Sequence, residues 1–186
     1  MLERDVKPPD RFEIVRGEIL ALSPTNAVHG QVETRITRLL GNEAEDAGLG
    51  LAFGGEVGVV VVHEPLRTVR GADAAFILQS QLPYDISSEG YLLTAPALVV
   101  EVLSPNDRAS EVQEKVLEYL SAGVQVVWVV DPLSRSVAVY RKNGAGLLLR
   151  EDDVLVAPGV LDNLKTKVSW LFHGLPHPSQ PPADKV

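Results

Sequence analysis

The segment Ala97-Leu98-Val99-Val100-Glu101-Val102-Leu103 decides how the rest of this chain is interpreted. All but one of its residues are apolar, which predicts a strand buried on both faces. Glu101 is the exception, and an ionised carboxylate buried without a partner costs several kcal/mol or takes up a proton. Glu101 therefore needs a partner charge, a metal ion or a chemical role.

A helix and a second buried strand follow this segment. Residues 107–122 place Val112, Val116 and Tyr119 on one face of an amphipathic helix, and Gly123 ends it. Residues 124–130 are again apolar and valine-rich. A strand–helix–strand unit predicts two parallel strands joined by a right-handed crossover.

Hairpin patterns dominate the rest of the chain. Arg16-Gly17 separates two short strand-like runs and predicts an N-terminal β-hairpin over residues 12–22. Further strands are expected at residues 57–63, 68–78, 136–141 and 147–150, and helices at residues 28–47 and 168–172. The sum is an α/β (α+β) fold, a mixed sheet with helices on its faces.

The chain has 186 residues, which fits one domain. We expect an irregular arm at residues 1–10, the domain at 11–173 and a poorly ordered proline-rich tail at 174–186. There is no cysteine, which excludes thiolate chemistry and fits a reducing cytoplasm. We identify no signal peptide and no apolar stretch long enough for a membrane span.

The formal net charge is −8, from 17 basic and 25 acidic residues. A general nucleic-acid binder normally has a basic surface, so this balance argues against tight DNA binding by an isolated monomer. It does not exclude a nuclease, because metal-binding carboxylates add negative charge locally.

Two further residues stand out near Glu101. Asp73 interrupts another strand-like run, and two carboxylates on neighbouring strands repel unless a proton or cation lies between them. A hard divalent cation prefers such oxygen ligands. Lys115 lies at the border of the apolar face of the 107–122 helix, from where its long side chain can reach the end of the Glu101 strand.

These residues lie in segments that resemble the Uma-type restriction endonucleases of the PD-(D/E)XK nuclease superfamily. The resemblance extends over roughly residues 11–172. The matching segments are Phe12 to Glu18, Ser23 to His29, Val69 to Phe76, Pro96 to Pro105, Lys115 to Tyr119, Gly123-Val124 and Val127 to Pro132. The order of these segments is more specific than any one of them.

The resemblance implies a restriction-endonuclease-like fold and metal-dependent hydrolysis of DNA. Asp73 and Glu101 would hold Mg²⁺, with Mn²⁺ as a substitute and the backbone carbonyl of Val102 as a further ligand. The chain departs from the superfamily pattern at Ala72, which replaces a proline, and at Leu103, which replaces a lysine. In this family the lysine is expected on the following helix, where Lys115 fits.

Other residues at matching positions allow more than one interpretation. His29 and Glu33 share a helix face and are accessory candidates as a ligand or proton shuttle, or they are a helix-start histidine and a solvated glutamate. Glu13 and Glu18 either edge the metal site or are exposed hairpin acids. For Glu101 itself, the alternative is a structural salt bridge, for instance to Lys115.

Two functions from different classes follow. The first is a Mg²⁺-dependent endonuclease, for which a homodimer or higher homo-oligomer is expected because cutting both strands most simply needs two copies. The second is a catalytically inactive protein that keeps the fold as a binding or assembly module. The acidic net charge favours the second, and the presence of Asp73, Glu101 and Lys115 favours the first.

Overall fold

A computed structural model describes residues 11–144 and 146–176. Within these residues the chain forms one mixed sheet. Its strands are β1 (Phe12–Val15), β2 (Glu18–Ala21), β3 (Gly50–Val62), β4 (Thr68–Leu78), β5 (Leu98–Val102), β6 (Val126–Asp131), β7 (Ser136–Arg141) and β8 (Gly146–Leu149). Their order is β2-β1-β4-β5-β6-β7-β8, and β3 pairs with β4 outside this path. The predicted mixed sheet and N-terminal hairpin are confirmed.

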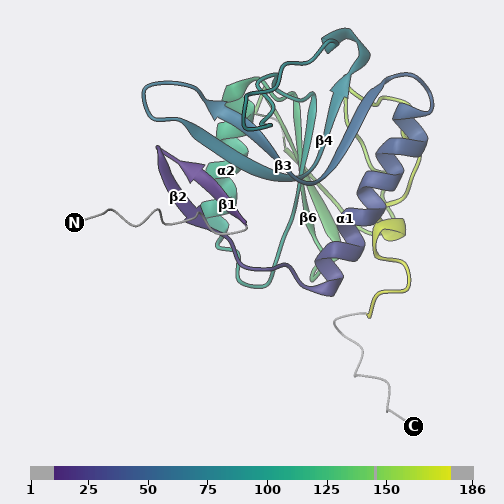
Figure 1. Cartoon of the computed structure of the whole chain (residues 1–186). Helices are drawn as coiled ribbons and strands as arrows, with labels where there is room; N and C mark the ends of the chain where they lie inside the picture. Colours follow the sequence, from purple (N-terminus) through teal and green to yellow (C-terminus); the bar gives the residue numbers. More distant parts are fainter. Residues whose placement is uncertain (1–10, 145, 177–186) are drawn as a thin grey trace.

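Two α-helices cover the sheet, and Figure 1 shows them on opposite sides of it. The first, α1 (Ala27–Leu40), begins at Asn26, whose side chain accepts a hydrogen bond from the backbone N–H of His29. The second, α2 (Ala109–Ala122), ends at Gly123, whose φ of 114° favours glycine. Shorter helical turns are η1 (Gly41–Glu45), η2 (Gln79–Gln81) and η3 (Val168–Phe172).

The β5–α2–β6 unit has the predicted parallel pairing, with Leu98 opposite Val126 and Val102 opposite Val130. Alternate residues of β5 pack into different layers. Val100 lies in the layer beneath α1, whereas Val99 lies in the layer beneath α2. Because side chains alternate along a strand, Glu101 is directed toward α2.

One edge of β4 is shared by two strands. Ile14 of β1 pairs with Val69, and β5 pairs with residues 74–76 of β4. Between these two pairings the edge of β4 at residues 70–73 has no strand beside it in the ladder. This gap places side chains from β1, β4, β5 and α2 next to one another, and the candidate site lies here.

Element boundaries differ most from the sequence prediction in two places. β3 begins at Gly50 rather than near Val57. Its glycine-rich first half has little strand propensity, so the sequence did not predict it, and pairing with β4 holds it as a strand. α1 ends at Leu40 and continues as the π-helical turn η1. The expected arm at 1–10 and most of the expected tail lie outside the described residues, while Leu175 packs against the core.

Candidate functional site

Glu101 is buried, with 8% of its surface exposed, and both of its carboxylate oxygens have side-chain partners from α2. Oε1 accepts a hydrogen bond from the Tyr119 hydroxyl at 2.7 Å, and Oε2 accepts one from Lys115 Nζ at 3.3 Å. Burial raises the pKa of Glu101 to about 7, although Lys115 lowers it and Asp73 raises it further. Near neutral pH this carboxyl therefore exchanges between its protonated and ionised forms.

Lys115 lies between two carboxylates. Its Nζ is 2.7 Å from Oε1 of Glu13 and 3.3 Å from Oε2 of Glu101. Burial alone would lower the pKa of Lys115, but the two acids raise it above its ordinary value. The lysine is therefore a permanent cation at the end of β5, which is where the sequence analysis expected it. Its ion pair with Glu101 is also the contact expected if Glu101 only forms a structural salt bridge.

Glu13 is a buried residue of β1, with 1% of its surface exposed, and not an exposed hairpin acid. Its Oε1 also accepts a hydrogen bond from the Gly71 N–H, and its Oε2 accepts one from Arg70 at 2.8 Å. Arg70 in turn donates to Glu118 at 2.6 Å. Burial would raise the pKa of Glu13, but Lys115 and Arg70 together lower it below its ordinary value. Glu13 therefore holds Lys115 in place as an ionised partner.

Glu18 is exposed on β2, and within the described residues no hydrogen bond or ion pair is found that joins it to this network. The hairpin pattern treats Glu13 and Glu18 alike. The two share a face of the hairpin but differ in burial, because Glu13 lies on β1 beside β4 and Glu18 lies on the outer strand β2.

Asp73 lies at the same gap, on β4. It comes directly before Ala74, where the pairing of β4 with β5 ends opposite Val100. Its Oδ2 accepts a hydrogen bond from the backbone N–H of Val102 at 2.6 Å and lies 3.3 Å from Nε2 of His29. The Asp73 side chain thus takes the place of a missing strand partner for β5.

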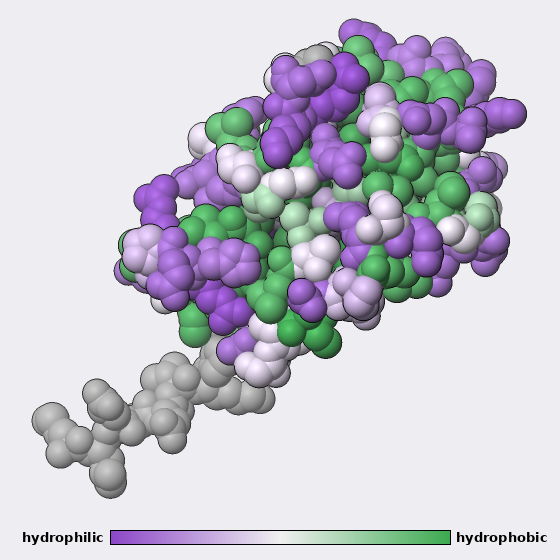
Figure 2. Space-filling model, turned by 90° about the horizontal axis from the view of Figure 1, so that it is seen from above, coloured by the Kyte–Doolittle hydropathy of each residue, from purple (hydrophilic) through white to green (hydrophobic). Residues whose placement is uncertain are grey.

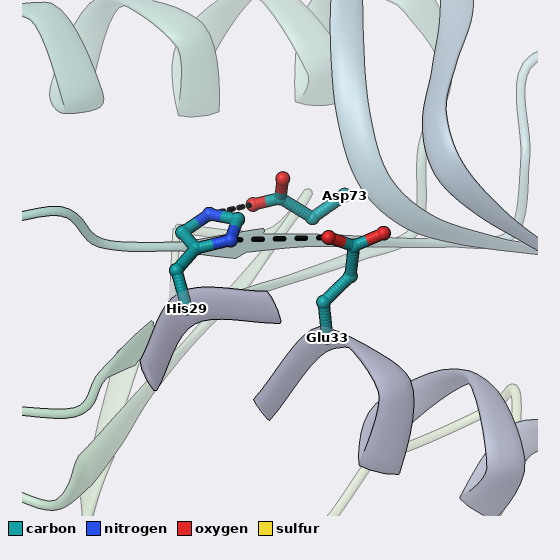
Figure 3. A group of neighbouring side chains, drawn as sticks. All are labelled: His29, Glu33 and Asp73. Atoms are coloured by element: carbon teal, nitrogen blue, oxygen red, sulfur yellow. Dashed lines mark ion pairs between the residues drawn. The ribbon is translucent and has the colours of Figure 1, made fainter. Parts of the chain in front are cut away.

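His29 and Glu33 of α1 complete this side of the site, as Figure 3 shows. His29 Nδ1 lies 3.8 Å from Oε2 of Glu33. Burial lowers the pKa of His29, but contacts with Asp73, Glu33 and the backbone of Val102 raise it overall. One ligand atom from each of His29, Glu33 and Asp73 lies within 4.8 Å of the others.

A cleft of about 320 Å³ opens beside Lys115. Five carboxylates and two cationic side chains contribute to its lining. The charged lining residues are Glu13, Arg70, Glu101, Asp107, Glu111, Glu114 and Lys115. The cleft is therefore acidic, which suits a cation better than an unaccompanied phosphate.

The residues at the gap fit a divalent cation. The negative charge of Asp73 raises the pKa of Glu101, so the two carboxylates are close enough to repel, and a cation between them relieves this repulsion. Both present oxygen ligands of the kind that Mg²⁺ prefers. Glu101 has to release Lys115 for this, while Glu13 can keep the lysine beside it.

Sequence reasoning did not place Glu118 and Tyr119 in the site, and for Arg70 it favoured a solvated strand end over a phosphate contact. Tyr119 and Lys115 are four residues apart on α2 and therefore share a face, which is the one signal that pointed to them. Arg70 carried no such signal, since a strand-end arginine is usually solvated.

The fold is nuclease-like. A crystal structure described as "a putative nuclease belonging to DUF820 from Anabaena variabilis ATCC 29413" matches with a TM-score of 0.72 and 21% sequence identity. The match covers 87% of this chain and 89% of that one. At this identity the likeness concerns the fold.

The family follows from the sequence match. A family model described as "Uma2: Putative restriction endonuclease" matches residues 1–168, so the chain belongs to the Uma2 family. No curated protein matches the chain at a significant level. Among the described residues, no helix is both long enough and apolar enough to cross a membrane.

Proposed function

We propose that this protein is a Mg²⁺-dependent endonuclease that hydrolyses phosphodiester bonds of DNA. Asp73 and Glu101 would hold the ion, with the backbone carbonyl of Val102 as a further ligand. The observation that supports the proposal is that Asp73 accepts a hydrogen bond from the Val102 N–H, next to Glu101, while Lys115 donates to Glu101 from α2. Family membership supports the reaction class.

The bound cation would polarise the scissile phosphate and acidify a water molecule. Lys115 would stabilise the negative charge that develops on the phosphoryl oxygens, because its ammonium group stands at the open side of Glu101. Glu13 would keep Lys115 there after Glu101 has turned to the cation. The chain thus supplies two ligands, one cationic group and a residue that positions it.

The test is nicking of supercoiled plasmid with Mg²⁺ or Mn²⁺. We expect Asp73→Asn, Glu101→Gln and Lys115→Met each to lose at least about 100-fold in rate, the scale of one electrostatic catalytic group. Glu43→Gln and Lys165→Met change exposed residues and should keep the wild-type rate. Nicking that survives both acid substitutions would refute the assignment.

The acidic lining of the cleft favours a second candidate, a non-catalytic binding module of the same fold. In that case the carboxylates and Lys115 would form a structural ion network. Cleavage would then be absent with every divalent ion, while the protein remained folded by circular dichroism.

A homodimer and a cytoplasmic location are part of the proposal. Figure 2 shows hydrophobic residues reaching the surface between hydrophilic ones. On the edge strand β2, Ile19 and Leu20 are about half exposed. Leu20 also lines the cleft, so this edge lies beside it. A second copy pairing there would bring two sites together. Light scattering should give twice the chain mass for wild type and for Leu148→Lys, and the chain mass for Ile19→Lys.

A further inference from the structure

We propose that His29, Glu33 and Asp73 form a second cation site, which takes a first-row transition-metal dication in preference to Mg²⁺. This site shares Asp73 with the site of the proposed nuclease but adds an imidazole. Its existence does not depend on nuclease activity, and only its catalytic use rests on the proposed function.

The local structure gathers the three side chains, with the His29 ring between the two acids: Nε2 faces Asp73 and Nδ1 faces Glu33 (Figure 3). His29 and Glu33 are four residues apart on α1 and share its inner face. Glu33 is held through Oε1, which accepts a hydrogen bond from the Gly55 N–H at 3.0 Å. Gly55 belongs to a bulge of β3 and has a φ of 82°, so the backbone there is shaped to present this N–H. Oε2 of Glu33 is left facing His29.

The orphaned nitrogen of His29 is the second, independent observation. His29 is 97% buried as judged from its 3% exposure, and its Nδ1 has no hydrogen-bond partner among the described residues. At 3.8 Å from Glu33 Oε2, the nitrogen is too far for a hydrogen bond. A buried polar atom of this kind costs free energy unless something binds it, and a metal ion of matching preference would do so.

Distances and charge suit a small dication. The ligand atoms of the three residues lie within 4.8 Å of one another. Two ligands at about 2.1 Å from one ion are at most about 4.2 Å apart, so any pair of ligand atoms near the 4.8 Å limit has to move closer together. Glu33, whose side chain is partly exposed, is the member that can move. A neutral imidazole with two carboxylates leaves a charge of about −2 for the ion to balance.

The imidazole sets the metal preference. Mg²⁺ favours oxygen ligands and keeps much of its water. Imidazole suits transition-metal dications better, and among these it binds Zn²⁺ more tightly than Mn²⁺. We therefore expect Zn²⁺ and Mn²⁺ to occupy this site and Mg²⁺ to leave it free at comparable concentration. The site would give the protein a preference for Zn²⁺ or Mn²⁺ over Mg²⁺, which the Asp73–Glu101 pair alone does not create.

Zn²⁺ titration followed by ¹⁵N NMR of the histidine rings tests this directly in the full chain. The chain has four histidines, so the ring signals can be assigned by substitution. We expect the His29 nitrogen signals to shift in wild type and in Glu101→Gln at a common Zn²⁺ concentration. In Glu33→Gln the affinity should fall at least about 10-fold, because losing a direct ligand costs no less than losing an outer partner.

Matched controls separate this site from adventitious binding. Glu43→Gln removes an exposed acid just beyond α1 and should leave the titration unchanged. His63→Gln removes an exposed histidine and should not alter the His29 signals. In parallel, electron paramagnetic resonance of free Mn²⁺ should show one fewer bound ion for Glu33→Gln than for wild type.

The proposal is overturned if Zn²⁺ leaves the His29 signals unshifted, or if Glu33→Gln binds Zn²⁺ and Mn²⁺ like wild type. Either result would mean that His29 is a structural bridge between the two acids. Failure of plasmid nicking with intact Zn²⁺ binding would instead refute only the proposed function. Nicking without any response of His29 would refute only the second site.

Discussion

Replacing Glu101 by glutamine should reveal the free-energy cost of its buried charge. In the unfolded chain this carboxyl titrates near its ordinary value of 4.5, whereas in the fold burial raises its pKa to about 7. The folded protein therefore holds a proton that the unfolded chain releases between these values. The contribution of Glu101 to stability therefore falls as pH rises from about 4.5, and its decline levels off above about 7.

The magnitude follows from the two pKa values. Linkage gives a cost of about 1 kcal/mol at pH 5 and about 3 kcal/mol at pH 8 relative to a carboxyl that titrates alike in both states. Without metal, Glu101→Gln should therefore gain about 2 to 3 kcal/mol in stability relative to wild type over this range. For a chain of this size the gain corresponds to about 5–10 °C in Tm.

Urea denaturation at pH 5, 6, 7 and 8 in EDTA measures this difference. Other titrating groups, including His29, contribute equally to both proteins and cancel in the comparison. The exposed Glu43→Gln should follow wild type at every pH. A constant difference between Glu101→Gln and wild type would refute the reasoning. Saturating Mg²⁺ should flatten the wild-type curve, because a bound cation favours the ionised carboxylate.

Three further substitutions test the supporting network by urea denaturation at pH 7. Glu13→Gln should cost about 3 kcal/mol, because it leaves buried cations without their shared partner, whereas the exposed Glu18→Gln on the same hairpin should change stability by less than about 0.5 kcal/mol. Tyr119→Phe should raise the pKa of Glu101 further and cost about 1.5–3 kcal/mol at alkaline pH, since the ionised carboxylate loses a donor; an unchanged pH profile would contradict this. Gly123→Ala should destabilise by more than about 1 kcal/mol, because a φ of 114° strains any residue with a Cβ, and equal stability would show that this helix end relaxes.

Much of the fold was predictable because local patterns agree with the tertiary arrangement. The apolar β5 and β6, the amphipathic α2 and its glycine end all carry strong signals, and the parallel pairing of Leu98 with Val126 followed from their order. β3 was predicted only in part. Its first half, Gly50 to Gly54, has weak strand propensity and forms because β4 supplies a partner.

The candidate site divides in the same way. Asp73, Glu101 and Lys115 were visible because a charge in an apolar context is conspicuous in a sequence. Arg70 was not, since nothing local indicates that it is buried against Glu13 and Glu118. Its burial depends on contacts with Glu118 and Glu13, which are 48 and 57 positions away in the chain. A single sequence carries no pattern for contacts over such separations.

The sequence alone determined that a carboxylate would be buried at position 101, because hydrophobic periodicity fixes which residues leave water. It also indicated the family and the order of the elements. Only the tertiary structure decided what Glu101 meets, namely Tyr119 and Lys115 rather than solvent. Only it showed that β1 and β5 leave a gap on β4, and that α1 brings His29 to the other side of Asp73. The physical reason is that burial follows from the local hydrophobic pattern around each residue. A binding site depends instead on the distances between residues that are remote in the chain.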